Sequence, residues 1–590
     1  MLSKTETPAI TPPATAAQMW LAQFQEALAA ADRARLKSLF HVESYWRDVL
    51  ALTWRIATID GADAVVNELM ARAGDSWPSG FLIDQDRTAP RWVMRAGTDA
   101  IEAIFKFETP EGRGSGLLRL TPDANEGGKL KAWTLLTALD GIKGHEERLG
   151  RSRQEDKVYS RDFHGPNWLD MRKAAAAYAD RDPTVLVVGG GQAGLSAAAR
   201  LGQLGVDTLI VDREQHIGDN WRHRYHALVL HNQTHVNHLP YMRFPPNWPA
   251  YIPKDKIAGW FEAYVDSMEL NYWTSTTFEG GAYDEKIGRW SVVLRKDGAA
   301  REMHPHHVVM ATGLSGAPSI PDIPTLDEFV GPVLHSSQYD EADKWKNKNV
   351  LVIGSGNSGH DIAQDLHASG AKVTLVQRSS TMVVNVEPSA QLPYALYDEG
   401  PPLEDCDLIT MSVPLVLARK SHKILTEKAK QIDKELLDGL ARKGFKLDFG
   451  DDGTGWQFKY LTRGGGYYFN VGCSDLIVQG EVGLLQFADI AGFVAEGARM
   501  QSGETLPADL IVLATGYKDQ NHLVRELFGD GVADRIGPIW GFGTGEELRN
   551  MFTRTAQPGL WFIAGSFAQC RIYSKYLGLQ IKACELGLLR

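Results

Sequence analysis

Few features of this sequence point to a secreted, membrane-spanning or metal-binding protein. The 590 residues include only four cysteines, Cys406, Cys473, Cys570 and Cys584, and none of them belongs to a CxxC pair. We therefore expect no dithiol redox centre and a reducing, cytoplasmic location. No apolar run reaches the roughly 18 residues that a membrane span needs. Residues 1–18 also lack the apolar core of a signal peptide.

The chain also lacks an excess of positive charge. It has 62 Lys and Arg against 73 Asp and Glu, a formal net charge of −11. Because nucleic-acid-binding proteins need basic surface, we expect no nucleic-acid partner. Five histidines cluster within residues 223–238, but no cysteine or carboxylate accompanies them at ligand spacing, so we expect no metal.

Glycine, in contrast, is abundant, with 58 residues, and it forms two similar motifs. Residues 185–194 read VLVVGGGQAG and residues 350–359 read VLVIGSGNSG. Each motif follows a β-branched run and precedes a helix-like stretch, the context in which GxGxxG binds the pyrophosphate of a dinucleotide. The predicted binding residues are Gly189, Gly191 and Gly194 in the first motif, and Gly354, Gly356, Asn357, Ser358 and Gly359 in the second. Two motifs in one chain imply two dinucleotides.

The residues that end the second strand of each unit distinguish the two dinucleotides. The strand DTLIVD ends at Asp212, where an acid can bind a ribose 2′-hydroxyl. The strand KVTLVQR leads instead to Arg378 and Ser379. The forked guanidinium of an arginine can bind a 2′-phosphate, so we predict that the second unit binds NADPH. The alternative is that Arg378 is an ordinary solvated arginine at a strand end. We expect some activity with NADH, because no acid at this strand end repels it.

The remaining pattern predicts an α/β chain with an added N-terminal domain. Residues 16 to about 150 predict helices first, including a segment around DVLALTW, and strands afterwards, which favours an α+β domain. This block resembles nuclear-transport-factor-2-like (NTF2-like) domains, chiefly in YWRDVLALTW and the closing strands.

We expect two Rossmann-type domains after this block, the second inserted in the first. WSVVLRK and HHVVMATG are predicted to return to the first sheet, as are ADLIVLATGY from 508 and the later GLWFIAG. The predicted division is a disordered tail 1–15, an NTF2-like domain 16–160, a FAD-binding domain 161–335 and 501–590, and an NADP-binding domain 336–500.

A further motif links the two units. Residues 329–339 read FVGPVLHSSQY, the pattern FxGxxxHxxxY with His335 and Tyr339. On this motif the chain resembles the class B flavoprotein monooxygenases, close to flavin-containing monooxygenases and YUCCA enzymes. The motif ends in Tyr339-Asp340, whereas Baeyer–Villiger relatives have Trp-Pro or Trp-Asp, which favours heteroatom oxidation. An N-terminal domain before such an enzyme resembles the type II subgroup, which combines both activities.

The resemblance implies further cofactor-binding residues. In GDNWRHRY, Asn220 and Trp221 would lie along the flavin, and the segment 230–245 would pass the flavin ring. Within that segment Asn232 matches an active-site asparagine, next to Gln233. The two strand-ending ATG motifs add Thr312 in the first and Thr515 and Gly516 in the second. His335 and Tyr339 would set the domain contact on which NADP lies; a purely structural role for His335 is the alternative.

The implied function is that of an NAD(P)H-dependent FAD monooxygenase. It would insert one atom of O2 into a small organic molecule through a C4a-(hydro)peroxyflavin, by N- or S-oxygenation, with Asn232 positioning that adduct. A Baeyer–Villiger monooxygenase is the main alternative. A pyridine-nucleotide–disulfide reductase is disfavoured by the missing CxxC, and a pure binding protein by the two intact motifs. The expected partners are the substrate and O2, and a homodimer is one possible assembly.

Overall fold

The computed structural model describes residues 11–72, 78–153, 163–543 and 545–589. Its N-terminal part is a mixed sheet, antiparallel except for one parallel pair of strands, with helices packed on it. The helices are α1 (Pro13–Ala29), α2 (Arg33–Ser38) and α3 (Ala62–Arg72), and the strands are β1 (Phe40–Val49), β2 (Ile56–Asp60), β3 (Ser79–Ile83), β4 (Arg91–Arg95), β5 (Thr98–Glu108), β6 (Gly112–Asp123) and β7 (Lys129–Ile142). The strand order is β2-β1-β7-β6-β5-β3, with β4 on β5. Helices followed by strands confirm the predicted α+β arrangement of this part.

Two local expectations in this part are wrong. Helix α1 begins at Pro13, inside the predicted tail of residues 1–15, of which residues 1–10 lie outside the described residues. The segment DVLALTW is not helical, because β1 continues to Val49 and the chain then bends. The Asp48 carboxylate explains the bend, since it accepts hydrogen bonds from the backbone N–H of Leu52 at 3.1 Å and of Thr53 at 2.7 Å. A side chain that binds nearby N–H groups competes with helix formation.

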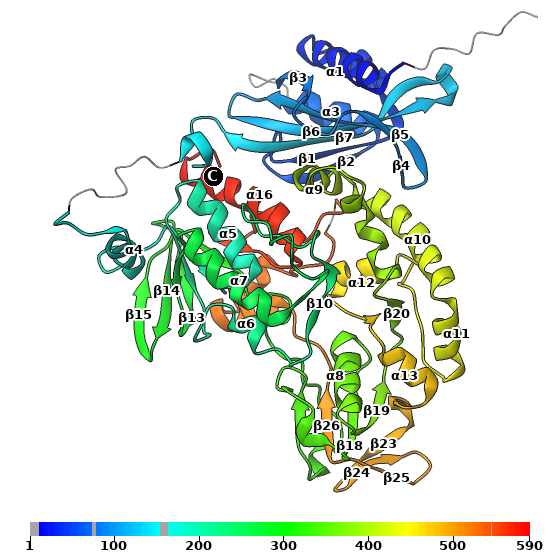
Figure 1. Cartoon of the computed structure of the whole chain (residues 1–590). Coiled ribbons are helices and arrows are strands. Elements are labelled where there is room, and N and C mark those ends of the chain that lie inside the picture. The colour runs from blue at the N-terminus through cyan, green and yellow to red at the C-terminus, as the bar shows by residue number, and fades with distance from the viewer. Residues whose placement is uncertain (1–10, 73–77, 154–162, 544, 590) are drawn as a thin grey trace, which may run out of the picture.

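The first parallel sheet contains the first glycine motif. Its strands are β8 (Val185–Val188), β9 (Thr208–Val211), β12 (Asn271–Trp273), β16 (His307–Met310) and β27 (Leu560–Phe562), in the order β12-β9-β8-β16-β27. Four of them are buried along their whole length, as expected for parallel strands covered on both faces. The surrounding elements are α4 (Trp168–Ala177), α5 (Gln192–Gln203), α6 (Asp219–Arg222), β10 (Val229–Gln233), β11 (Tyr251–Pro253), α7 (Lys254–Ser267), α14 (Gln520–Phe528), α15 (Asp530–Ile536) and α16 (Phe567–Glu585). Helix α16, red in Figure 1, packs between α5 and the N-terminal sheet.

The second parallel sheet contains the second glycine motif. Its order is β17-β26-β18-β19-β22, formed by β17 (Val333–His335), β18 (Asn349–Ile353), β19 (Lys372–Gln377), β22 (Gly483–Gln486) and β26 (Leu510–Leu513). The other elements here are α8 (Asn357–Ala368), β20 (Met382–Asn385), the 3-10 segment η6 (Ser389–Asp398), α9 (Leu403–Met411), α10 (Leu415–Ile432), α11 (Lys434–Arg442), α12 (Gly455–Arg463), β21 (Tyr467–Asn470), α13 (Cys473–Gln479), β23 (Ile490–Val494), β24 (Gly497–Met500) and β25 (Thr505–Pro507). In Figure 1 this sheet lies at the opposite end of the molecule from the N-terminal domain.

Two strands lie in other sheets than expected. ADLIVLATGY forms β26, which pairs with β17 and β18 of the second sheet rather than with the first. WSVVLRK lies in β14 (Arg289–Lys296), between β13 (Thr276–Asp284) and β15 (Ala299–Met303), in a separate antiparallel sheet. The expectation that HHVVMATG and GLWFIAG join the first sheet is confirmed by β16 and β27. The sequence of a short apolar strand does not indicate which sheet the strand joins, and this explains both errors.

Candidate active site

The first glycine motif forms a tight turn between β8 and α5. Gly189 has φ +105°, and a Cβ on it would lie 2.6 Å from the carbonyl oxygen of Ala311. A Cβ on Gly194 would lie 2.0 Å from the carbonyl oxygen of Gly189. A Cβ on Gly191, in contrast, would approach only the Nδ2 atom of Asn220, at 3.0 Å. Gly189 and Gly194 must therefore be glycines because a Cβ there would collide with backbone atoms. Gly191 instead leaves open space beside the start of the helix.

The second motif repeats this division between β18 and α8. A Cβ on Gly354 would lie 2.2 Å from the carbonyl oxygen of Ala514, and one on Gly359 would lie 1.9 Å from that of Gly354. A Cβ on Gly356 would meet no protein atom nearer than 3.9 Å. Both middle positions thus fit the close approach of a pyrophosphate.

The helices that follow are open at their N-termini. Gly191 and Gly356 are the N-cap residues of α5 and α8, and neither helix has a side-chain cap. The first N–H groups of a helix have no partner within the helix and carry a partial positive charge, so they attract phosphate. The residues present therefore fit two dinucleotides.

Asp212 lies beside the first turn and is nearly buried. Its carboxylate accepts hydrogen bonds from the backbone N–H of Gly190 at 2.6 Å and of Glu214 at 2.9 Å. These bonds fix the carboxylate at the end of β9, next to the turn. Its contact with a ribose stays a prediction.

Both helix starts open into one cavity of about 1160 Å³. It is lined by Gly189–Ala193 at the start of α5 and by Asn357 and Ser358 at the start of α8. The predicted site residues on its wall are Gly189, Gly191, Asp212, Asn220, Trp221, Asn232, Thr312, Tyr339, Asn357 and Ser358. Those that do not line it are Gly194, Gln233, His335, Gly354, Gly356, Gly359, Arg378, Ser379, Thr515 and Gly516.

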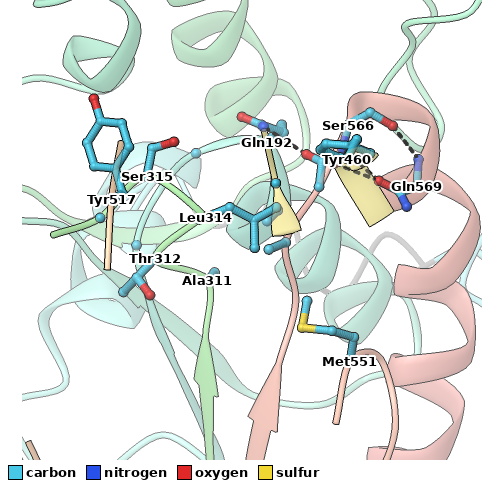
Figure 2. A pocket seen from close by; sticks show the side chains of 18 of the residues that line it. Gln192, Ala311, Thr312, Leu314, Ser315, Tyr460, Tyr517, Met551, Ser566 and Gln569 are labelled. Atoms are coloured by element: carbon cyan, nitrogen blue, oxygen red, sulfur yellow. Dashed lines mark hydrogen bonds between the residues drawn. The ribbon is translucent and has the colours of Figure 1, made fainter. Parts of the chain in front are cut away.

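Figure 2 shows how distant segments meet at this cavity. Gln192 of α5 donates from Nε2 to the carbonyl oxygen of Gly565 at 3.2 Å. Ser566 caps α16 by accepting from the N–H of Gln569. The Tyr460 hydroxyl of α12 donates to the Gln569 side chain at 2.9 Å. Helix α12, from the second half of the chain, is thereby joined to the first dinucleotide turn.

Asn232 lies at the end of β10 with its amide in the cavity wall. Its Nδ2 atom donates to the hydroxyl oxygen of Tyr394 in η6, at 3.1 Å. Burial raises the pKa of Tyr394 to about 12, so that this hydroxyl stays neutral near pH 7. The neighbouring Gln233 points elsewhere, and its Nε2 donates to Glu387 at 2.9 Å.

His335 and Tyr339 are both buried, but only Tyr339 reaches the cavity. His335 Nε2 lies 3.0 Å from the carbonyl oxygen of Gly516, and Nδ1 lies 2.9 Å from the Ser337 hydroxyl. Burial lowers the pKa of His335, which favours the neutral ring. The Tyr339 hydroxyl donates to Asp365 of α8 at 2.7 Å. Both residues hold the loop after β17 against its neighbours.

The end of β19 presents Arg378 to solvent. Among the described residues Arg378 has no hydrogen-bond or ion-pair partner, and Ser379 is exposed beside it. Gln377 is buried and exchanges hydrogen bonds with the backbone of Lys446 at 2.8 and 3.0 Å. Arg378 is therefore free to bind an anion next to α8.

Two further predicted residues, Thr515 and Gly516, serve the loop after β26. The Thr515 hydroxyl donates to the carbonyl oxygen of Ser319 at 2.6 Å, and Gly516 accepts from His335. Asn357 also makes a structural bond, since its Oδ1 accepts from the backbone N–H of Phe469 at 3.0 Å.

Three buried polar atoms on the cavity wall have no partner among the described residues: Trp221 Nε1, Ser336 Oγ and Gln457 Oε1. Since buried polar groups are nearly always hydrogen-bonded, these three atoms are candidates for hydrogen bonds to a bound molecule or to water. Sequence reasoning found Trp221 but missed Ser336 and Gln457. Ser336 lies inside the FxGxxxHxxxY motif and could have been found there, whereas no motif marks Gln457.

Glu214, Asp219 and His223 bring potential ligand atoms within 4.8 Å of one another. Asp219 is already bound to Arg222 at 2.8 Å and lies 3.1 Å from the His216 ring. These contacts satisfy the acid without an ion, and the absence of a metal stays a prediction.

The chain is similar to known flavin enzymes. A family model described as pyridine nucleotide-disulphide oxidoreductase matches residues 183–396. Indole-3-pyruvate monooxygenase YUCCA1 of Oryza sativa subsp. japonica is 30% identical over 346 residues, which cover 57% of this chain and 77% of that protein. The chain belongs to the class B flavoprotein monooxygenases. The probable indole-3-pyruvate monooxygenase YUCCA4 of Arabidopsis thaliana is also 30% identical, covering 57% of this chain and 76% of its own length.

Solved structures of this class share the fold. Cyclohexanone monooxygenase from Rhodococcus sp. Phi1, bound to NADP+, superposes with a TM-score of 0.50 at 17% identity, over 69% of this chain and 85% of its own. Membership of this class makes the chain an NAD(P)H-dependent flavin monooxygenase with FAD and NADPH as cofactors, as the sequence predicts. No helix of the described residues combines the length and apolarity of a membrane span.

Proposed function

We propose that this monooxygenase oxygenates a sulfur or nitrogen atom of a small organic molecule. The observation that carries the proposal is the single cavity, because the starts of α5 and α8 both line it. Two dinucleotides on these helices would face one shared cavity, as hydride transfer from nicotinamide to flavin requires. When bound, FAD supplies the redox chemistry and the activation of O2.

The residues of the chain would bind, orient and shield. We assign FAD to the first glycine turn with Asp212, Asn220, Trp221 and Thr312, and NADPH to the second turn with Arg378. Asn232 would position reacting groups through its amide, held by Tyr394. His335 and Tyr339 act as positioning residues in this proposal, because their polar atoms bind protein groups.

We also propose a domain division, which strand pairing supports. An NTF2-like domain comprises the N-terminal sheet and α1–α3. The FAD-binding domain contains β8 to β16 and returns with β27, and the NADP-binding domain inserted in it spans β17 to β26. These limits replace the predicted boundaries 336 and 500. A cytoplasmic location and a homodimer stay predictions, and sedimentation of the purified enzyme tests the dimer.

Oxygenation of indole-3-pyruvate and Baeyer–Villiger oxidation of a ketone are the two alternative reactions. The related enzymes are named for indole-3-pyruvate, and the superposed structure is a cyclohexanone monooxygenase. Tyr339-Asp340 replaces the Trp-Pro or Trp-Asp expected of Baeyer–Villiger relatives, and this difference supports heteroatom oxidation.

The test is a panel of four compounds under 18O2, with products identified by mass spectrometry. The compounds are thioanisole, N,N-dimethylaniline, cyclohexanone and indole-3-pyruvate. We expect sulfoxide or N-oxide carrying one 18O atom, formed with NADPH consumption. Product from cyclohexanone or indole-3-pyruvate alone would contradict heteroatom oxidation while leaving the enzyme a monooxygenase.

A further inference from the structure

We propose that the cavity extends into a chamber for an uncharged aromatic substrate with a hydrogen-bond donor, and that Gln457 binds this donor. The chamber is the part of the cavity lined by Arg47, Ile56 and the lining residues of 393–418, 456–469 and 542–573. The inference rests on the proposed function, because it concerns the substrate of that reaction.

The face of α12 defines one wall of the chamber. Gln457, Tyr460 and Leu461 line the cavity and are spaced three and four residues apart. Residues at this spacing share one face of a helix, so α12 turns a continuous stripe toward the cavity. Tyr460 in this stripe contacts Gln569, next to the first dinucleotide turn (Figure 2). A molecule bound along the stripe would therefore lie close to the flavin.

Aromatic rings form much of the remaining wall. Trp456 lies 6.1 Å from Tyr394 and 4.7 Å from Phe469, between ring centroids, and Tyr467 lies 5.1 Å from Phe469. All four rings line the cavity. Tyr394 also accepts the hydrogen bond from Asn232, so this group of aromatic rings lies next to the predicted active-site amide. Aromatic walls favour stacked or edge-to-face contacts with an aromatic ligand.

The positive charge of the chamber is paired, and the acids on its wall are Glu547 and the exposed Glu546. Of the described residues that line it, Arg47 alone carries a positively charged side chain. Arg47 Nε and Nη2 lie 2.9 and 2.7 Å from the two carboxylate oxygens of Glu547, and Nη1 donates to the carbonyl oxygen of Met411. Burial alone would lower the pKa of Arg47, but the Glu547 carboxylate and the Tyr573 hydroxyl raise it.

Glu547 is held in turn by the N-terminal domain. Its Oε1 accepts from the Thr58 hydroxyl at 2.8 Å. A substrate carboxylate would have to displace Glu547 from Arg47 or remain unpaired in a largely apolar space, and both are unfavourable. The chamber thus disfavours an acid such as the one for which the plant relatives are named.

Gln457 supplies a polar contact for a neutral ligand. Its side chain belongs to the cavity wall, and its Oε1 is buried and has no partner among the residues that the structure describes. An unpaired buried acceptor is unfavourable, and a ligand O–H or N–H removes that penalty.

Three sulfides that differ only in the para substituent test the chamber. They are thioanisole, 4-(methylthio)phenol and 4-(methylthio)benzoate. Affinity is measured on the FAD-containing enzyme with NADP+, by titration of the flavin absorbance, and turnover is measured separately. We expect the phenol to bind about tenfold more tightly than thioanisole, the gain of one hydrogen bond, and the benzoate to bind at least tenfold more weakly.

Two variants assign these differences to residues. Gln457→Leu should make the affinity for the phenol equal to that for thioanisole, because the hydrogen bond to the phenol is lost. Glu547→Gln should free Arg47 and strengthen benzoate binding about tenfold, whereas the double change Arg47→Gln with Glu547→Gln should not. The control is Lys575→Gln, which breaks the 2.6 Å pair with Asp140 between the N-terminal domain and α16, away from the cavity.

The results separate this inference from the proposed function. Equal affinity for the three sulfides, or an unchanged phenol advantage in Gln457→Leu, overturns the chamber even if sulfoxide forms. Gain of benzoate binding in Lys575→Gln or in the double variant overturns the role of the Arg47–Glu547 pair. If no sulfide is oxidised but the binding order holds, the proposed reaction fails and the chamber stands.

Discussion

Replacing Gly356 by alanine should impair NADPH binding without destabilising the protein. Gly356 has φ −84° and ψ −172°, an extended conformation that alanine adopts without strain. The added Cβ would lie 3.9 Å from its nearest neighbour, the carbonyl oxygen of Tyr467. The stability change should therefore stay within about 1 kcal/mol, and a small gain is expected because alanine restricts the unfolded chain.

The effect on the coenzyme follows from the same open space. A methyl group there holds the pyrophosphate away from the first N–H groups of α8. Loss of one charge-assisted hydrogen bond amounts to about 1.5–3 kcal/mol, or about ten- to a hundredfold in affinity. The KM for NADPH should rise by that factor, while FAD content stays at the wild-type level because the first turn is unchanged.

Gly359→Ala provides the contrast and Gly202→Ala the control. A Cβ on Gly359 would lie 1.9 Å from the carbonyl oxygen of Gly354, so the turn must move, at a cost of about 1–3 kcal/mol or more. Gly202, in α5, has no atom within 4 Å of its Cβ position. The measurements are thermal unfolding, FAD absorbance and anaerobic flavin reduction at varied NADPH. An unchanged KM in Gly356→Ala, or normal stability of Gly359→Ala, would refute the division of roles among the glycines.

Three further changes test other parts of the structure. Arg378→Ala should raise the KM for NADPH about tenfold and leave that for NADH nearly unchanged, since only NADPH carries the 2′-phosphate; an equal loss with both coenzymes would contradict the assignment. Asn232→Ala should preserve flavin reduction but raise hydrogen peroxide release relative to oxygenated product, and unaltered coupling would exclude a positioning role. Glu585→Gln should lower the urea midpoint at pH 7. Burial alone would raise the pKa of Glu585, but hydrogen bonds from His307 and His306 lower it from 4.5 to about 2. Its contribution is therefore present above pH 4.5 and disappears toward pH 2, so the variant and wild type should converge in acid; a difference that grows there would oppose this reasoning.

The sequence was most informative where local geometry determines chemistry. The GxGxxG motifs predicted both turns because a β-branched strand, a glycine turn and a helix occur together within about ten residues. Their glycines fill distinct roles in the structure, as Gly189 and Gly191 illustrate. The membership of β26 could not be predicted in this way, because its four buried apolar residues would suit either sheet.

The chamber residues were beyond sequence reasoning for a different reason. Arg47 and Glu547 are 500 residues apart, and their pairing depends on how the N-terminal domain docks. Gln457 lies on a short helix without a motif, and its significance comes from the missing partner of one oxygen atom. Such features become visible only when the positions of all surrounding groups are known.

Buried ion pairs also hold the N-terminal domain against the rest of the protein. Besides the Arg47–Glu547 pair, Arg87 Nε lies 2.7 Å from Asp405 of α9. Burial alone would raise the pKa of Asp405, but hydrogen bonds from Thr88 and the pair with Arg87 lower it. Charges at an interface regain water when it opens, so they contribute less to affinity than to register. The buried pairs therefore fix one orientation of the domain, and that orientation places Arg47 at the wall of the cavity.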